Sequence, residues 1–441
     1  MVLLASSTAN NQLTAYDATL LSLTLTEKSG GQVSVLAQPV GDEFLHLNGR
    51  TEPLVTLNIP QGVYVSASAS GGAIAFCSGQ VPGNDFTAII GGSATVKVNL
   101  PQPITITGGA MTLVLDLQAT PSTPFSGGCP ESLTFVPIST PTFNLQPVDP
   151  NAAAAAGGNL EFSGLQGLIA SVDPGGASLT LNSISGYSTN APAWHAALSS
   201  STVFQGVAGA SQLASGLPVD FDMALQPDGS LVVTRIEVLS TNTTNLTLMD
   251  GLPIEVTPSI TTTRIIGTSW EGYLSEPAGG PGPVIYSSAK FQVSGQLGNL
   301  AALPFTPSFT AANFVPGQNL ALTTQATALT GGPAYIPIAT VTLIPQTIDG
   351  KVTSVSSQGN FTTYTIQLPA YSVFPQFAVQ PMQNSLLTDP STMVVYADAS
   401  TRMLNTGTIA AGSAFRFYGL VFNDNGVLRM DCAQVNDGVA E

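Results

Sequence analysis

Two short sequences, each of which recurs along the chain, decide the fold. The first is Gly167-Leu-Ile-Ala-Ser-Val172, and the second is Leu231-Val-Val-Thr-Arg-Ile-Glu-Val238, which follows the hairpin sequence Pro227-Asp228-Gly229. Apolar and polar residues alternate in the second sequence, and this period of two is typical of a half-buried β-strand. Asp-Gly favours a tight hairpin because both turn residues must tolerate positive φ. We therefore expect a small antiparallel barrel of five or six strands that resembles the OB fold.

Three copies of this unit follow one another. The last copy opens with Gly350-Lys-Val-Thr-Ser-Val355 and closes with Val427-Leu-Arg-Met-Asp-Cys-Ala-Gln-Val435. The middle copy is degenerate, and we assign its opening strand to Gly272-Tyr-Leu-Ser275 and two later strands to residues 317–322 and 338–343. Because a packing unit is repeated without any shared reactive residue, the pattern indicates construction rather than catalysis.

The first part of the chain has a different pattern. Its short alternating strands are separated by paired glycines, which is typical of a β-sandwich. A run of proline, alanine and glycine then marks a boundary. The sequence thus predicts an all-β chain with an N-terminal β-sandwich over 1–148, a linker over 149–158, and β-barrel repeats over 159–243, 244–346 (degenerate) and 347–441. The connections are short, so we expect adjacent modules to abut as a semi-rigid rod.

Composition excludes several classes of protein. The chain has 441 residues, of which only 8% are charged, with 10 Lys and Arg against 26 Asp and Glu and a net charge of −16. A nucleic-acid-binding protein needs basic patches, and this sequence has no run of Lys or Arg. No apolar run approaches the ~20 residues of a membrane helix. The low-charge, Ser/Thr/Gly-rich composition is expected of an exported bacterial protein, extracellular or on the cell surface. A surface made mostly of neutral polar residues favours association because charge repulsion is weak.

Two stretches of the first domain carry a resemblance. Glu43-Phe-Leu-His-Leu-Asn-Gly49 and Ile59-Pro-Gln-Gly-Val-Tyr64 resemble an uncharacterised domain family of exported bacterial proteins, which implies a transthyretin-like sandwich. The repeats resemble a second uncharacterised family of small OB-like barrels, with a "G.v.sv" opening and an "l..dG.l.a..ie" ending. Neither resemblance carries a catalytic motif, so the two imply export and architecture only.

The three cysteines allow one internal disulfide. Cys77 and Cys129 both lie in the first domain, and in an oxidising compartment we expect them to pair. Cys432 ends the last repeat and is interpreted as a small buried hydrophobic residue, with intermolecular pairing as the alternative.

A search for catalytic, cofactor-binding or metal-binding residues predicts none. His46 is interpreted as a strand histidine that faces solvent or a neighbour, and two histidines cannot supply a three-histidine metal centre. Gly-x-Ser-x-Gly and the EF-hand pattern are absent from the sequence. Asp220 and Asp222 are expected on one strand face, and Asp228 in a turn. The sequence therefore predicts a protein that is not an enzyme and needs no cofactor.

The remaining function classes are structural and binding. We expect a self-assembling cell-surface or filament subunit whose partners are copies of itself in a head-to-tail homopolymer. Residues 1–15 are the expected connector, which would add a strand to a neighbour; the alternative is that they form the first strand of their own domain. The alternative function is carbohydrate binding, with surface polysaccharides as the partners. The candidate contacts are aromatic residues of the repeats: Tyr187, Trp194, Trp270 and Tyr273.

Overall fold

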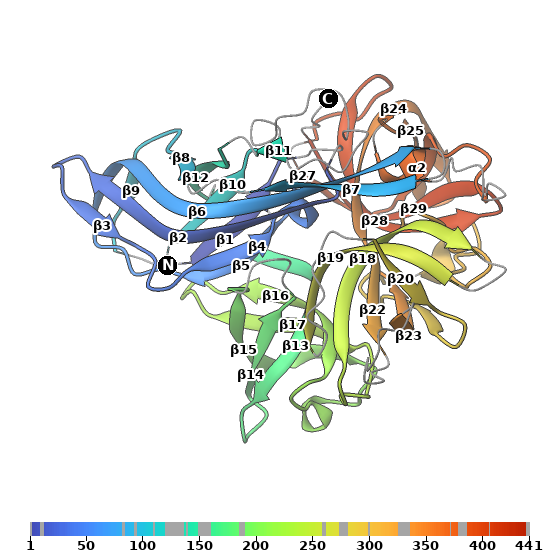
Figure 1. Ribbon diagram of the computed structural model, residues 1–441, viewed down its shortest axis with the longest axis horizontal. Coiled ribbons are helices and arrows are strands. Elements are labelled where there is room, and N and C mark those ends of the chain that lie inside the picture. The colour runs from blue at the N-terminus through green and yellow to red at the C-terminus, as the bar shows by residue number, and fades with distance from the viewer. Residues whose placement is uncertain are drawn as a thin grey trace.

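The computed structural model is all-β, as predicted, with a sandwich at the N-terminal end and small barrels after it (Figure 1). The structure describes residues 2–8, 13–81, 84–91, 95–108, 111–119, 136–137, 140–148, 160–184, 190–257, 262–272, 281–298, 300–324, 336–370, 372–377, 386–404 and 406–437. No helix among these residues is long and apolar enough to cross a membrane.

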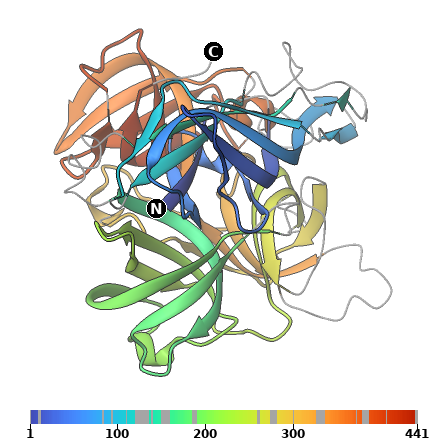
Figure 2. The same cartoon turned by 90° about the vertical axis from the view of Figure 1, so that its left-hand side faces the viewer.

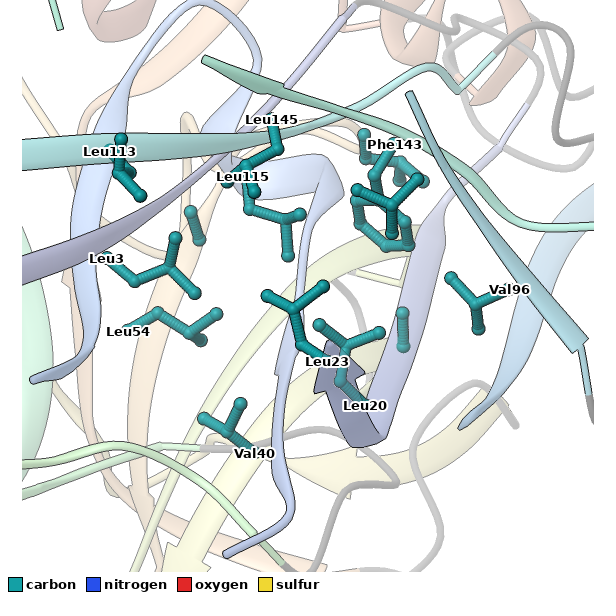
Figure 3. Close-up of a cluster of buried hydrophobic side chains, with 14 of the residues drawn as sticks. Leu3, Leu20, Leu23, Val40, Leu54, Val96, Leu113, Leu115, Phe143 and Leu145 are labelled. Carbon is teal, nitrogen blue, oxygen red and sulfur yellow. The ribbon is translucent and has the colours of Figure 1, made fainter. Parts of the chain in front are cut away.

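The sandwich contains twelve strands in one continuous, folded sheet. Its elements are β1 (Val2–Ser7), β2 (Ala15–Glu27), β3 (Gln32–Ser34), β4 (Val40–Glu43), η1 (Leu45–Leu47), β5 (Thr51–Thr56), β6 (Gly62–Val81), β7 (Asn84–Gly91), β8 (Thr95–Asn99), β9 (Ile104–Ile106), β10 (Thr112–Leu117), β11 (Val136–Pro137) and β12 (Thr142–Pro147). One layer is formed by β5, β1, β10 and β12, and the other by β2, β3, β4, β6, β7, β9 and β11. Strand β8 pairs with both β12 and β6. The apolar side chains of the two layers meet between them (Figure 3).

The N-terminal strand β1 is an interior strand of its own sandwich. It pairs in parallel with β10 and antiparallel with β5, so both of its edges are occupied. Leu3 and Ala5 enter the sandwich core, while Val2 and Leu4 point the other way and pack into the core of the first barrel. The hypothesis that this segment is a free connector is therefore wrong. The pairing could not be predicted from the local sequence, because the partner strand β10 lies more than 100 residues further along the chain.

Module 1 is a closed five-stranded barrel. It comprises β13 (Leu160–Val172), β14 (Ser178–Ser183), β15 (Ala193–Gln205), η2 (Ala210–Gln212), β16 (Pro218–Leu225) and β17 (Leu231–Val238). The strand order is β13-β14-β15-β17-β16, which is an OB-like order. All pairings are antiparallel except that of β15 with β17, which is parallel and closes the barrel. The predicted barrel is confirmed, but it is not wholly antiparallel.

Modules 2 and 3 repeat this strand order. Module 2 contains β18 (Thr247–Thr257), β19 (Thr262–Gly272), β20 (Pro281–Ile285), β21 (Lys290–Val293), η3 (Leu300–Ala302), β22 (Leu320–Thr324) and β23 (Ile336–Leu343). Module 3 contains β24 (Gln346–Gln358), β25 (Phe361–Gln367), α2 (Val373–Phe377), β26 (Thr392–Ala397), β27 (Arg402–Leu404), β28 (Ala414–Asp424) and β29 (Val427–Asn436). In each module the third strand is split in two, and its first part closes the ring by a parallel pairing with the last strand.

The glycine that begins each opening sequence allows two strands to approach closely. A Cβ at Gly167 would collide with the carbonyl oxygen of Asn182 on β14, and a Cβ at Gly350 would lie 2.7 Å from Cδ1 of Ile366. In module 2 the corresponding glycine is Gly251 on β18, whereas Gly272 ends the second strand, β19. Our assignment of the middle opening strand to residues 272–275 is therefore wrong. Two residues after Gly251 stands Pro253, where Gly167 and Gly350 are followed by the β-branched Ile169 and Val352, and this proline breaks the pattern.

The four parts pack around a common centre instead of forming a rod. Figures 1 and 2 both show the sandwich and the three modules side by side around the middle of the molecule. The long strand β6 reaches α2 of module 3, and β7 reaches β20 of module 2. Side-chain hydrogen bonds join the parts: Trp194 Nε1 to Pro53 O (2.6 Å), Asn48 Nδ2 to Asp349 Oδ2 (3.1 Å), Ser294 Oγ to Asp220 Oδ2 (3.0 Å) and Gln318 Nε2 to Val421 O (2.9 Å). The predicted rod is thus replaced by a closed arrangement.

Candidate functional site

A cavity of about 160 Å³ lies where the sandwich and all three modules meet. Each module contributes the polar residue that precedes its opening glycine, namely Gln166, Asp250 and Asp349. Their positions on the barrels correspond, because the next residue pairs with the start of the fourth strand in every module. The repeated strand therefore places one polar side chain of each module on the same cavity.

The sandwich supplies the fourth wall mainly through residues 43–52, with Leu13 and Thr14 beside them. Strand β4 ends with Asp42 and Glu43, the turn η1 carries His46, and β5 carries Glu52. Our interpretation of His46 as a strand residue is wrong, because the chain turns over 45–47 between two strands of the sandwich. This turn brings the imidazole between two carboxylates.

His46 is held on both ring nitrogens. Nδ1 lies 3.2 Å from Glu43 Oε2, and Nε2 lies 3.1 Å from Glu52 Oε2. Burial opposes protonation of the imidazole, but the carboxylates of Glu52 and Glu43 outweigh it and raise the pKa of His46 well above its ordinary value. Glu43 is itself fixed, because it accepts hydrogen bonds from the backbone N–H groups of Tyr16, Leu45 and His46. The group is a rigid imidazolium between two buried carboxylates.

Asp42 shares a proton with Glu52. Burial raises the pKa of Asp42 well above its ordinary value, and the neighbouring Glu52 raises it further. The hydrogen bond from Asp42, together with His46 and Arg50, lowers the pKa of Glu52 despite its own burial. Asp42 is thus the protonated donor and Glu52 the ionised acceptor. This accounts for Asp42 Oδ2 and Glu52 Oε1, two buried oxygens that have no N–H or hydroxyl partner in the described part of the chain.

Asp250 faces the cavity from module 2 as a buried acid. The side-chain amide of Gln166 donates to its Oδ1 at 3.2 Å and also contacts Oδ2. Burial raises the pKa of Asp250 well above the ordinary value; the charge of His46 lowers it in part, and Asp220 and Glu43 raise it. No basic side chain of the described residues forms an ion pair with Asp250.

On the module 3 side, the cavity wall is built from cations and an aromatic ring. The guanidinium of Arg50 lies 4.1 Å from the centre of the Tyr418 ring. Asn48 donates to Asp349 and accepts a hydrogen bond from Arg416 Nη1 at 3.2 Å. Near the site, therefore, sandwich and module 3 are joined by a stacked guanidinium and a short polar chain.

The arrangement is suited to binding and to holding the modules together. Both nitrogens of His46 are engaged by carboxylates, so the imidazole has no free lone pair with which to act as a base. Within the described residues, no group of three or more His, Cys, Asp or Glu side chains is placed to hold a metal ion.

Of the four predicted aromatic contacts, the structure describes the side chain of Trp194. Trp194 is only 4% exposed and packs on Phe221, with its indole N–H donated to the sandwich, so it cannot stack on a sugar; as a candidate carbohydrate contact it is corrected to a packing residue. Trp194 lies on the inward face of β15, whose neighbours Ala193 and His195 are exposed. Tyr187 and Tyr273 lie outside the described residues, as does the side chain of Trp270.

The remaining predicted residues are partly placed. Cys129 and the side chain of Cys77 lie outside the described residues, so their disulfide stays a prediction. Cys432 is buried and free, and burial raises the pKa of its thiol, so it behaves as an unreactive core residue. Asp220 and Asp222 do share one face, where both contact Arg235.

Sequence reasoning missed the cluster around His46, although a signal for it was present. Five titratable residues (Asp42, Glu43, His46, Arg50 and Glu52) occur in the eleven positions 42–52 of a chain that is only 8% charged. Such a local concentration in a neutral protein indicates a site at which charges are paired. The contributions of Gln166, Asp250 and Asp349 carry no comparable signal, because they depend on how the modules are arranged.

No protein-family model matches the chain, and no curated protein matches it. The resemblance of the two domain types to uncharacterised families therefore stays an expectation from sequence, and the function is argued from the geometry.

Proposed function

We propose that this is a non-catalytic extracellular structural protein, a subunit that associates with copies of itself at the cell surface or in a filament. The observation that carries the proposal is an uncharged hydroxyl face on the sandwich. The outward side chains of β2 and β6 form the cross-strand pairs Ser22–Ser70, Thr24–Ser68 and Thr26–Ser66, and β3 adds Ser34 beside Thr24. We call these seven residues the hydroxyl face.

The surroundings of the hydroxyl face support association. Leu21 beside it is 58% exposed, and Val63 and Val65 on β6 are also exposed. The seven residues of the hydroxyl face carry no charge, so hydroxyl groups and exposed apolar side chains can meet a neighbour there without direct repulsion. Association through this face replaces the connector role that β1 cannot play.

The distribution of charge also supports a passive role. Arg50, Arg402 and Arg416 each contact another part of the molecule: Tyr418, Glu161 and Asn48, respectively. Buried Arg235 organises Glu237 and Asp220, which accept hydrogen bonds from Gly295 and Ser294 of module 2. These cations hold a rigid block together, which suits a building element.

The proposal is tested by introducing charge on the hydroxyl face. Thr24→Lys with Ser70→Lys places two cations on neighbouring strands without opposing them directly. Sedimentation velocity should show a mass that rises with concentration for the unmodified protein and a monomer for this variant. Ser200→Lys with Ser356→Lys, at exposed serines of modules 1 and 3, is the matched control and should associate normally. If the unmodified protein stays monomeric, or if both variants associate equally, the proposal is wrong.

A further inference from the structure

The central cavity contains polar groups that the protein itself leaves without partners. The wall formed by Glu43, His46 and Glu52 is saturated, and so is Gln346, which accepts from Asn319 N–H and donates to Gly317 O. The hydroxyls of Thr347 and Ser372 are different. Both line the cavity, neither has a hydrogen-bond partner among the described residues, and Ser372 is only 5% exposed. A buried hydroxyl without a partner costs about 1–3 kcal/mol, so a cavity lined by two of them is expected to hold a polar occupant.

Two further groups face the cavity with unused hydrogen-bonding capacity. The guanidinium of Arg50 stacks on Tyr418, and within the described chain it forms no ion pair or side-chain hydrogen bond. Among the described residues, the side chain of Asp250 has a polar contact with the amide of Gln166 and no other side-chain partner. The cavity thus offers a pure donor in Arg50, a carboxyl group in Asp250, and two hydroxyls that both donate and accept.

The charges around the cavity favour a neutral occupant. A bound anion would face the carboxylates of Glu43 and Glu52, and a bound cation would face Arg50 and the His46 imidazolium. Either would place a charge beside like charges in a buried site, which is costly. A neutral molecule with several hydroxyl groups can accept from Arg50, donate to Asp250, and exchange hydrogen bonds with Ser372 and Thr347.

The size and the apolar part of the lining restrict the occupant further. At a share of about 30 Å³ per molecule, the cavity of about 160 Å³ has room for roughly five waters, which is the space of a single sugar ring. Leu252, Ile344 and Val373 offer apolar contacts to the C–H groups of such a ring. We propose that the central cavity is a binding site for one monosaccharide unit, either a free sugar or the terminal residue of a glycan, held by Arg50, Asp250, Thr347 and Ser372. This goes beyond the structural role and does not depend on it.

The test uses the full chain with glucose, galactose and N-acetylglucosamine, and with a disaccharide of each, as probes in saturation-transfer NMR. We expect saturation transfer to at least one sugar with millimolar affinity. A preference for the monosaccharide identifies a free sugar, and a preference for the disaccharide identifies a glycan end; both support the proposal. Ser372→Ala, which removes one hydroxyl without adding volume, should weaken binding several-fold, up to about tenfold, since a neutral hydrogen bond is worth about 0.5–1.5 kcal/mol. Arg50→Gln should weaken binding about tenfold or more, since a hydrogen bond to a charged group is worth about 1.5–3 kcal/mol.

The control is Arg402→Gln, a change at a partly exposed arginine that does not line the cavity, and it should leave binding unchanged. If Arg50→Gln does not fold, Ser372→Ala decides alone. Absence of saturation transfer from every probe means that the cavity holds water only and overturns the proposal. Binding that Ser372→Ala leaves unchanged places the sugar elsewhere and overturns it as well.

Discussion

Truncation of β1 should unfold the sandwich and loosen its junction with module 1. Leu3 and Leu4 are both fully buried, but they enter different cores, one in the sandwich and the other in module 1. A buried Leu→Ala change typically costs about 2–5 kcal/mol, through lost transfer energy and the cavity that remains. Because the two side chains share no partners, the costs of Leu3→Ala and Leu4→Ala should nearly add, to about 4–10 kcal/mol. This is comparable to the whole stability of a domain, about 5–15 kcal/mol.

The junction contains its own optical probe for this experiment. Trp194 is buried between module 1 and Pro53 of the sandwich, and the chain has only one other tryptophan, Trp270. In a Trp270→Phe background, urea unfolding followed by fluorescence therefore reports on the junction. Leu21→Ala on the same sandwich is the control; because Leu21 is mostly exposed, we expect a change within about 0.5 kcal/mol. The reasoning is refuted if Leu3→Ala and Leu4→Ala cost no more than Leu21→Ala, or if a chain without residues 1–7 unfolds like the full chain.

Three further predictions concern pH, packing and covalent structure. Burial raises the pKa values of Asp42 and Asp250, so above about pH 4 the folded state binds more protons than the unfolded state. The free energy of unfolding should therefore fall as pH rises, by up to about 1.4 kcal/mol per pH unit for each acid. Urea unfolding at several pH values tests this: if Asp250→Asn leaves the midpoint with an equally steep pH dependence, the prediction is wrong. Gly167→Ala should destabilise module 1 by about 1–3 kcal/mol because the new methyl group meets the backbone of Asn182, whereas Gly175→Ala in the same module, where the methyl group meets nothing within 4 Å, should be nearly neutral in thermal unfolding. Cys77 and Cys129 should appear as one disulfide-linked peptide in mass spectrometry of unreduced native protein; free thiols at both positions would exclude the bond.

The repeated barrel was predictable because its signals are local. The hairpins at Asp228-Gly229 and Asn425-Gly426 come from residues that tolerate positive φ, and Gly229, Asn425 and Gly426 all adopt it. The closing strands β17 and β29 follow the alternation that the sequence shows. The opening strand of module 2 was misplaced because Gly251 is followed by Leu-Pro-Ile and not by the pattern of its counterparts.

The candidate site was not predictable in the same way, because it is made by contacts between distant segments. Asn48 meets Asp349 across 301 positions of the chain, and β1 finds β10 across more than 100. An alternating pattern says that Trp194 lies on one face of β15, but not that this face turns inward towards Phe221. In the sequence, only the concentration of charged residues over 42–52 indicates the cluster around His46. It does not indicate which residues of the three modules complete the site.

Electron microscopy of the native, full-length protein tests the central proposal most directly. If the protein is a self-associating structural subunit, negatively stained samples at high concentration should show filaments or ordered sheets that Thr24→Lys with Ser70→Lys abolishes. The control, Ser200→Lys with Ser356→Lys, should form the same assemblies as the unmodified protein. A field of single, separate particles at every concentration, for the unmodified protein and the variants alike, would contradict the account.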